Sequence, residues 1–157
     1  MRRKVFRYFA VLLAVLFIAA QFIRPEKNLG QDSPGHIFNQ VELPGELRQN
    51  LQEACMDCHS DRTNYQWYNN IAPVSWMVSR HVAEGKKSLN FSEWGNFSNF
   101  DKITALDGIY KEVKEDKMPL KSYSLIHKSA RLSKEEKEKL ITWADHLASK
   151  LTESENN

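Results

Sequence analysis

The amino-acid sequence predicts an all-α protein, and three observations favour this fold class. Apolar residues recur at spacings of three and four in several stretches, which is the pattern of one buried helix face. No stretch shows the alternation of apolar and polar residues that marks a half-buried strand. A proline closes one helical stretch and a capping sequence opens another. We therefore expect a small bundle of helices.

The first two predicted helices cover about residues 44–59 and 73–87. Two cysteines continue the apolar stripe of the first helix, so they are expected to face the core. That stripe consists of Leu47, Leu51, Ala54, Cys55 and Cys58. The second helix has an apolar-leaning side made of Val74, Met77, Val78, His81 and Val82.

The third and fourth predicted helices follow the same spacing. The third covers about residues 100–117 and ends before Pro119, which cannot continue a helix. Its stripe consists of Ile103, Leu106, Tyr110 and Val113. The fourth begins at Ser133, whose hydroxyl and the Glu136 carboxylate form a capping box. Its inner face carries Leu140, Ala144, Leu147 and Leu151, with Trp143 beside them.

The residues Cys55-Met56-Asp57-Cys58-His59 form a CxxCH run, which is the attachment pattern of c-type haem. Two thiols at this spacing can add to the two vinyl groups of one haem, and the adjacent histidine can bind the iron. The chain has no other cysteine, so neither thiol is left over. We therefore predict one covalent haem c held by Cys55 and Cys58, with His59 as the proximal iron ligand.

Other meanings of the run fit the sequence less well. A thioredoxin-like redox pair needs a preceding strand, and here a helix is predicted before the run. A structural zinc site needs four ligands, whereas this run supplies three and no second pair follows. A disulfide or a chance match remains the simplest alternative.

The N-terminus predicts export. Arg2, Arg3, Lys4 and Arg7 precede an apolar run from Tyr8 to Ile23. As a helix this run spans ~24 Å, short of the ~30 Å hydrocarbon core, but starting at Val5 it approaches that thickness. We predict a transmembrane anchor at residues 1–24, with the domain outside the cytoplasm because cations precede the apolar run. Cleavage after Ala20, which gives a periplasmic protein, is the alternative.

The charge balance gives no support for a nucleic-acid partner. Five of the 22 Lys and Arg residues lie at positions 2–24, which contain none of the 20 acidic residues. The exported part therefore has 17 basic and 20 acidic residues, a net charge of −3. The basic character of the chain belongs to its topology signal.

The rest of the chain divides into three expected parts. Residues 25–45 contain prolines and glycines with few apolar residues, which predicts a tether. Residues 46–151 form the haem-binding domain, and residues 152–157 a polar tail.

The sixth iron ligand is the main open question, because a methionine raises the potential relative to a second histidine. Met118 is favoured, since it follows the third helix and is fixed by Pro119. His81 and His127 are the alternatives. Met56 lies inside the attachment loop, His36 in the predicted tether and His146 on a solvated helix face. Met77, on the His81 side of its helix, is expected to pack in the core.

The chain resembles a small bacterial haem-binding domain family related to cytochrome c, over most of positions 46–147. The resemblance lies in the run from Cys55 to His59, in Tyr65-Gln66-Trp67-Tyr68, in residues 71–76 and 89–94, in Met118-Pro119 with Tyr123 and His127, and in Leu132-Ser133 with Trp143. It implies a cytochrome-c-like bundle around one covalent haem in the periplasm, and it favours Met118 as the distal ligand.

The aromatic residues between the motif and the third helix have two possible roles. Trp67, Tyr68, Trp76, Phe91 and Trp94 are expected to pack around the porphyrin, because aromatic side chains bury a large area. The alternative is a docking patch for a partner.

Three functions remain in view. The first is one-electron transfer by a membrane-tethered monohaem cytochrome of the inner membrane, with an unidentified redox partner protein and no enzymatic turnover. The second is a redox or gas sensor, which needs a displaceable sixth ligand. The third is an accessory subunit of a periplasmic oxidoreductase.

Overall fold

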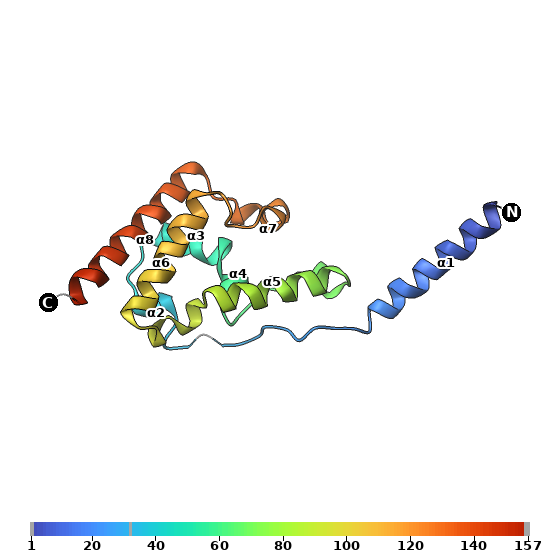
Figure 1. The fold of residues 1–157 in the computed structure, drawn as a ribbon, viewed down its shortest axis with the longest axis horizontal. Helices are drawn as coiled ribbons and strands as arrows, with labels where there is room; N and C mark the ends of the chain where they lie inside the picture. The colour runs from blue at the N-terminus through green and yellow to red at the C-terminus, as the bar shows by residue number, and fades with distance from the viewer. Residues whose placement is uncertain (1, 32, 156–157) are drawn as a thin grey trace.

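The computed structural model describes residues 2–31 and 33–155, and within them the fold is all-α, as predicted. Its α-helices and short 3-10 helices (η) are α1 (Arg2–Ala20), α2 (Ile37–Gln40), α3 (Gly45–Ala54), α4 (Met56–His59), η1 (Trp67–Asn70), α5 (Val74–Ser88), η2 (Phe91–Asn96), α6 (Asn99–Lys114), α7 (Lys121–Ile126), η3 (Lys128–Ala130) and α8 (Lys134–Glu155). Figure 1 shows α6 and α8 packed along each other, with α3, α4 and α5 beside them.

The N-terminal helix corrects one prediction. α1 stands apart from the other helices and buries none of its residues (Figure 1). In the described part of the chain, no helix is both long enough and apolar enough to cross a membrane, contrary to the predicted transmembrane helix. The helix ends at Ala20 rather than Ile23, and its uncharged part from Tyr8 onward spans only ~20 Å.

The hydrophobic core confirms most of the stripe residues of α3, α6 and α8, whereas Met77 of α5, which was expected to pack in the core, is 46% exposed. Leu51 of α3, Leu106 of α6 and Leu140 of α8 are all buried in one cluster. The residues between α5 and α6 close this cluster, since Phe91 and Trp94 are buried in it as well.

Residues 25–45 pack on the domain more closely than a tether would. Ile37 is fully buried in the core, and Leu29 pairs with Arg62 in an isolated antiparallel bridge. The Gly30 amide donates to the Asp61 carbonyl at 2.7 Å, and a Cβ at Gly30 would lie only 2.6 Å from that oxygen. These contacts are mostly main-chain hydrogen bonds, which leave no periodic pattern in a sequence.

The helix starts agree with expectation except at the motif, whereas α6 ends at Lys114 rather than at about residue 117. α5, α6 and α8 begin within one residue of the predicted starts. The capping box is present, because the Ser133 amide donates to the Glu136 carboxylate at 2.7 Å and the Glu136 amide donates to the Ser133 hydroxyl at 3.2 Å. The helix predicted over residues 44–59 is instead two helices, which separate at Cys55.

Candidate functional site

The CxxCH run forms a helical turn of its own. Cys55 has φ −124° and ψ −41°, outside helical values, so it ends α3 and begins α4. The His59 amide then donates to the Cys55 carbonyl at 3.0 Å, which closes the turn. Because of this break, the axis of the motif turn α4 does not continue the axis of α3.

His59 is held in the form that a metal ligand requires. Its Nδ1 lies 3.0 Å from the Leu89 carbonyl, which can only accept, so Nδ1 carries the proton. The lone pair is therefore on Nε2, the nitrogen available to iron. Burial lowers the pKa of His59, against the opposing effect of the Leu89 and Gly85 carbonyls, which favours the neutral ring.

An apolar cavity of about 600 Å³ lies beside this histidine. Cys55 and His59 line it from the motif, Leu89 and Phe91 from the segment after α5, and Met118 from the segment after α6. We call it the apolar cavity. Its volume is within the ~300–1,000 Å³ typical of ligand and cofactor sites.

One face of α6 forms a wall of the apolar cavity, and the sequence reasoning missed it. The lining residues of this face are Thr104, Ala105, Gly108, Ile109 and Glu112. Gly108 has no side chain, and a Cβ there would meet nothing within 4 Å. A glycine inside a helix is unfavourable and therefore suggests a special role. Gly108, one turn after the small Ala105, was the sequence signal of a helix face without large side chains.

Met118 alone among the considered sixth-ligand residues lines the apolar cavity. Met77, His81 and His127 line a different pocket. Met56 and His36 line a third cavity, and His146 lies in a groove beside Trp143. The Met118 amide is fixed by a 3.1 Å hydrogen bond to the Glu112 carbonyl of α6.

Cys58 faces a small pocket of about 60 Å³, which we call the tyrosine pocket. Tyr68 and Tyr123 line it, and the Tyr68 hydroxyl lies 2.6 Å from Nε2 of His127. Nδ1 of His127 is buried without a hydrogen-bond partner among the described residues. The two cysteines thus border different pockets, one on each side of the motif turn.

A hydrogen bond ties the motif to the segment after Met118. The Tyr123 hydroxyl, on α7, donates to the Asp57 carboxylate at 2.7 Å. Burial, followed by this bond to a carboxylate, raises the pKa of Tyr123, so the phenol stays protonated. This hydrogen bond therefore connects the CxxCH turn with α7, the helix that follows Met118.

Close packing of α5 on α4 depends on Gly85. A Cβ at this position would lie 2.5 Å from the Cys58 carbonyl oxygen. Any side chain at Gly85 would therefore push the motif turn away from α5.

Both thiols are protonated in this fold. Burial, followed by the charge of Cys58, raises the pKa of Cys55 to about 12. Burial, followed by the charge of Asp57, raises the pKa of Cys58 to about 11. Neither cysteine is in a disulfide.

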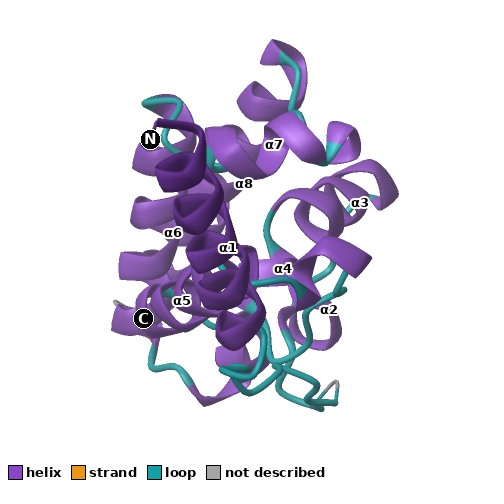
Figure 2. Cartoon of the chain, turned by 90° about the vertical axis from the view of Figure 1, so that its right-hand side faces the viewer, coloured by secondary structure: helices purple, strands orange, loops and turns teal. Residues whose placement is uncertain are grey.

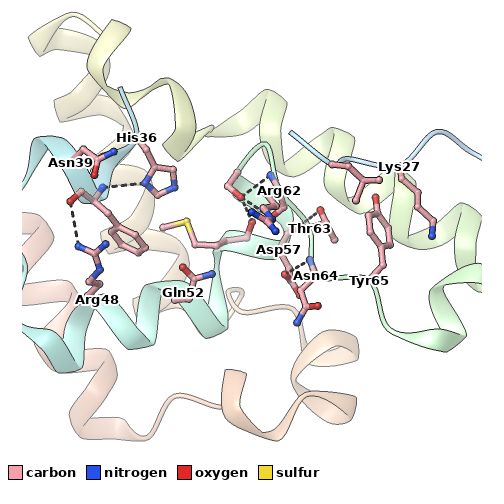
Figure 3. Close-up of a pocket in the computed structure, with 14 residues that line it drawn as sticks. Lys27, His36, Asn39, Arg48, Gln52, Asp57, Arg62, Thr63, Asn64 and Tyr65 are labelled. Atoms are coloured by element: carbon pink, nitrogen blue, oxygen red, sulfur yellow. Dashed lines mark hydrogen bonds between the residues drawn. The ribbon is translucent and has the colours of Figure 1, made fainter. Parts of the chain in front are cut away.

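The third cavity has a volume of about 700 Å³ and is polar. Met56 and Asp57 of α4 are among the residues that line it. Figure 3 shows His36 and Arg48 at one end of it, Arg62 near the middle and Lys27 at the other end. We call it the polar cavity.

The aromatic residues do not all lie in one place. Phe91 lines the apolar cavity and meets the His59 ring edge-on at 6.3 Å between centroids. Trp94 is buried in the core behind it. Trp67 and Trp76 are exposed, so they do not line this cavity.

An all-α fold with a CxxCH turn, a neutral histidine and an apolar cavity defines a haem-binding class of protein. The chain belongs to the haem-binding domain family, whose family model matches residues 15–146. No curated protein and no solved structure matches it.

The residues present fit a haem. The apolar cavity offers a nitrogen lone pair at His59, a thiol at Cys55 and a thioether at Met118. A flat wall at Gly108 suits a planar ring.

Proposed function

We propose that the protein is a c-type monohaem cytochrome that carries single electrons. The observation that supports this most directly is that His59 and Met118 line the same apolar cavity as Cys55. Bound haem would supply an iron centre that changes oxidation state by one electron. Two axial side chains would leave no position for a substrate, so we assign the protein no catalytic turnover.

In this proposal, Cys55 and Cys58 would hold one haem through thioether links, in which each thiol adds across a vinyl group with no loss of electrons. His59 would supply Nε2 to the iron, while the Leu89 carbonyl holds its ring in place. Met118 would supply a thioether ligand, which raises the potential relative to a second histidine.

We propose that the N-terminal segment directs the domain to the periplasm, where it serves a membrane redox partner. The support is the four cations that precede the apolar part of α1. Fractionation of cells, with the mass of the mature chain, tests this: a cytoplasmic protein would contradict it.

Carbon monoxide tests the electron-transfer proposal. Full-length protein, made together with a haem maturation system, is reduced and its spectrum recorded with and without the gas. A low-spin ferrous spectrum that does not change is expected, because Met118 fills the sixth position. Rapid and tight binding would contradict the proposal and favour a gas sensor.

A further inference from the structure

The end of the domain that faces α1 carries an exposed apolar surface. It is formed by Trp67, Ile71, Trp76, Met77, Leu125 and Ile126, from η1, the start of α5 and α7, and we call it the α5–α7 face. Trp67 and Leu125 are 75% and 72% exposed. Figures 1 and 2 show α7 and the start of α5 on the side of the domain toward α1.

The parts of the α5–α7 face are joined to one another. Met77 and Ile126 both line the tyrosine pocket, and the Trp67 ring contacts the Tyr68 ring edge-on at 5.7 Å. The Tyr68–His127 hydrogen bond links η1 to the end of α7. The exposed residues therefore belong to one continuous surface rather than to separate sites.

The chain leaving α1 is bound to this same face. The Gln21 side chain exchanges hydrogen bonds with the Ala72 backbone at 3.0 and 3.3 Å. The Trp76 indole donates to the Ile23 carbonyl at 2.7 Å. α1 itself exposes large apolar side chains on all sides, among them Phe9, Leu13 and Phe17. Whatever covers α1 is therefore held close to the α5–α7 face.

The segments that form the α5–α7 face carry basic residues and almost no acidic ones. Residues 62–83 contain no Asp or Glu, and residues 117–134 contain five cations and no Asp or Glu. The chain after residue 24 is nevertheless acidic overall, with 17 basic against 20 acidic residues. Lys121 and Lys128 flank Leu125 and Ile126 in the chain, and Lys121 also shares a surface pocket with Asp116.

We propose that the α5–α7 face lies on an anionic lipid surface. Exposed tryptophans with a polar N–H suit the headgroup region, and apolar side chains such as Leu125 and Ile126 suit the acyl boundary. Lys121 and Lys128 would meet anionic headgroups, which attract cations near a membrane. A lipid surface is favoured over a protein partner because the exposed apolar helix α1 is connected to the domain at this same face. The inference uses the proposed membrane location but not the identity of the sixth ligand.

This orientation has a consequence for the haem. Cys58 lines the tyrosine pocket, whose rim includes Met77 and Ile126 of the face. Cys58 would therefore be the haem-holding cysteine nearer to the lipid surface.

An environment-sensitive dye tests the proposal in the full-length holoprotein, in which haem occupies both native thiols. The dye is placed at Ile126→Cys and, as a matched control, at Phe100→Cys. Phe100 is 73% exposed at the start of α6, on the side of the domain away from α1 (Figure 1). With vesicles of phosphatidylcholine and phosphatidylglycerol, emission at position 126 is expected to shift to the blue and emission at position 100 to stay unchanged.

A second variant separates the face from α1. Lys121→Glu with Lys128→Glu should return the emission at position 126 to its vesicle-free value, whether or not α1 keeps the protein on the vesicles in a sedimentation assay. Removing one cation should weaken attachment of the face about fivefold. Lys111→Glu with Lys150→Glu changes the charge equally elsewhere and should have no effect.

Three outcomes would overturn the proposal: equal emission at positions 126 and 100, a shift that is as large with pure phosphatidylcholine, or a shift without vesicles that grows with protein concentration. The last would assign the face to a second copy of the chain. The haem spectrum is recorded throughout, so that failure of the haem site is recognised separately.

Discussion

Two cavities of similar volume border the motif turn α4, and each is lined by one histidine and one methionine. The apolar cavity has His59 and Met118, and the polar cavity has His36 and Met56. The same pair of residue types therefore occurs twice, but only the apolar cavity also contains a thiol of the CxxCH run. Residue types alone do not make the site.

The hydrogen bonds of the two histidines explain the difference. Nδ1 of His59 donates to the Leu89 carbonyl, which leaves the lone pair on Nε2. Nδ1 of His36 instead accepts from the Phe38 amide at 3.2 Å, as the N-cap of α2, so the neutral ring carries its proton on Nε2. His59 is prepared to bind a metal, whereas the lone pair of His36 is already in use.

The largest expected effect comes from the two histidines. His59→Ala should abolish the native low-spin spectrum, because the proximal ligand is lost. His36→Ala should leave the spectrum unchanged and weaken the fold by ~1 kcal/mol through the lost cap. Absorption spectra of both variants, with haem staining after denaturation, measure this. A spectral change in His36→Ala would end the distinction between the cavities.

The methionines give the next largest effect. Met118→Ala should remove the sulfur-to-iron absorption and lower the reduction potential, because a thioether ligand is lost. Met56→Ala should keep the potential and lower the free energy of unfolding by ~2–5 kcal/mol, since Met56 is only 2% exposed. Redox titration and denaturant unfolding measure the two quantities. An unchanged spectrum in Met118→Ala would move the assignment to His81 or His127.

The wall of the apolar cavity gives a smaller effect with two opposite signs. Gly108→Leu should reduce haem incorporation, because its side chain would enter the cavity from α6. The same change should stabilise α6 in the haem-free chain by ~0.5–1 kcal/mol, since glycine is unfavourable inside a helix. Haem content per chain and unfolding of the haem-free protein test this. Gly45→Leu, at the start of α3 with open space around it, is the control.

The last predictions concern the capping box at the start of α8, which lines neither cavity. Ser133→Ala should cost ~1 kcal/mol of stability with no change in the haem spectrum.

The hydrogen bond from the Ser133 amide lowers the pKa of Glu136. Its stabilising effect is therefore full above the ordinary carboxyl pKa and is lost as pH falls through the lowered value. Glu136→Gln should remove this part of the acid dependence in thermal unfolding. A Glu136→Gln curve parallel to that of the wild type would contradict it.

Local patterns in the sequence predicted the parts of the fold that depend on neighbouring residues. The stripes of α3, α6 and α8, the capping box at Ser133 and the place of the motif all follow from spacing. Segments held by main-chain hydrogen bonds were missed, as residues 25–45 show. The break at Cys55 was missed as well, because the stripe through Cys58 is compatible with one continuous helix.

Two residues that line the apolar cavity were singled out by the sequence, but the walls of the cavity were not. His59 and Met118 stood out as residue types that bind iron, and both line the apolar cavity. The α6 wall includes Thr104, Gly108 and Glu112, and a pattern search for apolar residues passes over them. The carbonyl that orients His59 comes from Leu89, thirty positions away, and no local rule predicts it.

In the proposed cytochrome, the Asp57–Tyr123 hydrogen bond would affect the speed of electron transfer. One end of this bond lies in the turn that carries His59, and the other lies on α7, shortly after Met118. In the proposed cytochrome, this brace would hold the two axial side chains at a constant separation in both oxidation states. Such rigidity keeps the reorganisation energy small, so an electron can arrive and leave without a rearrangement of the ligands.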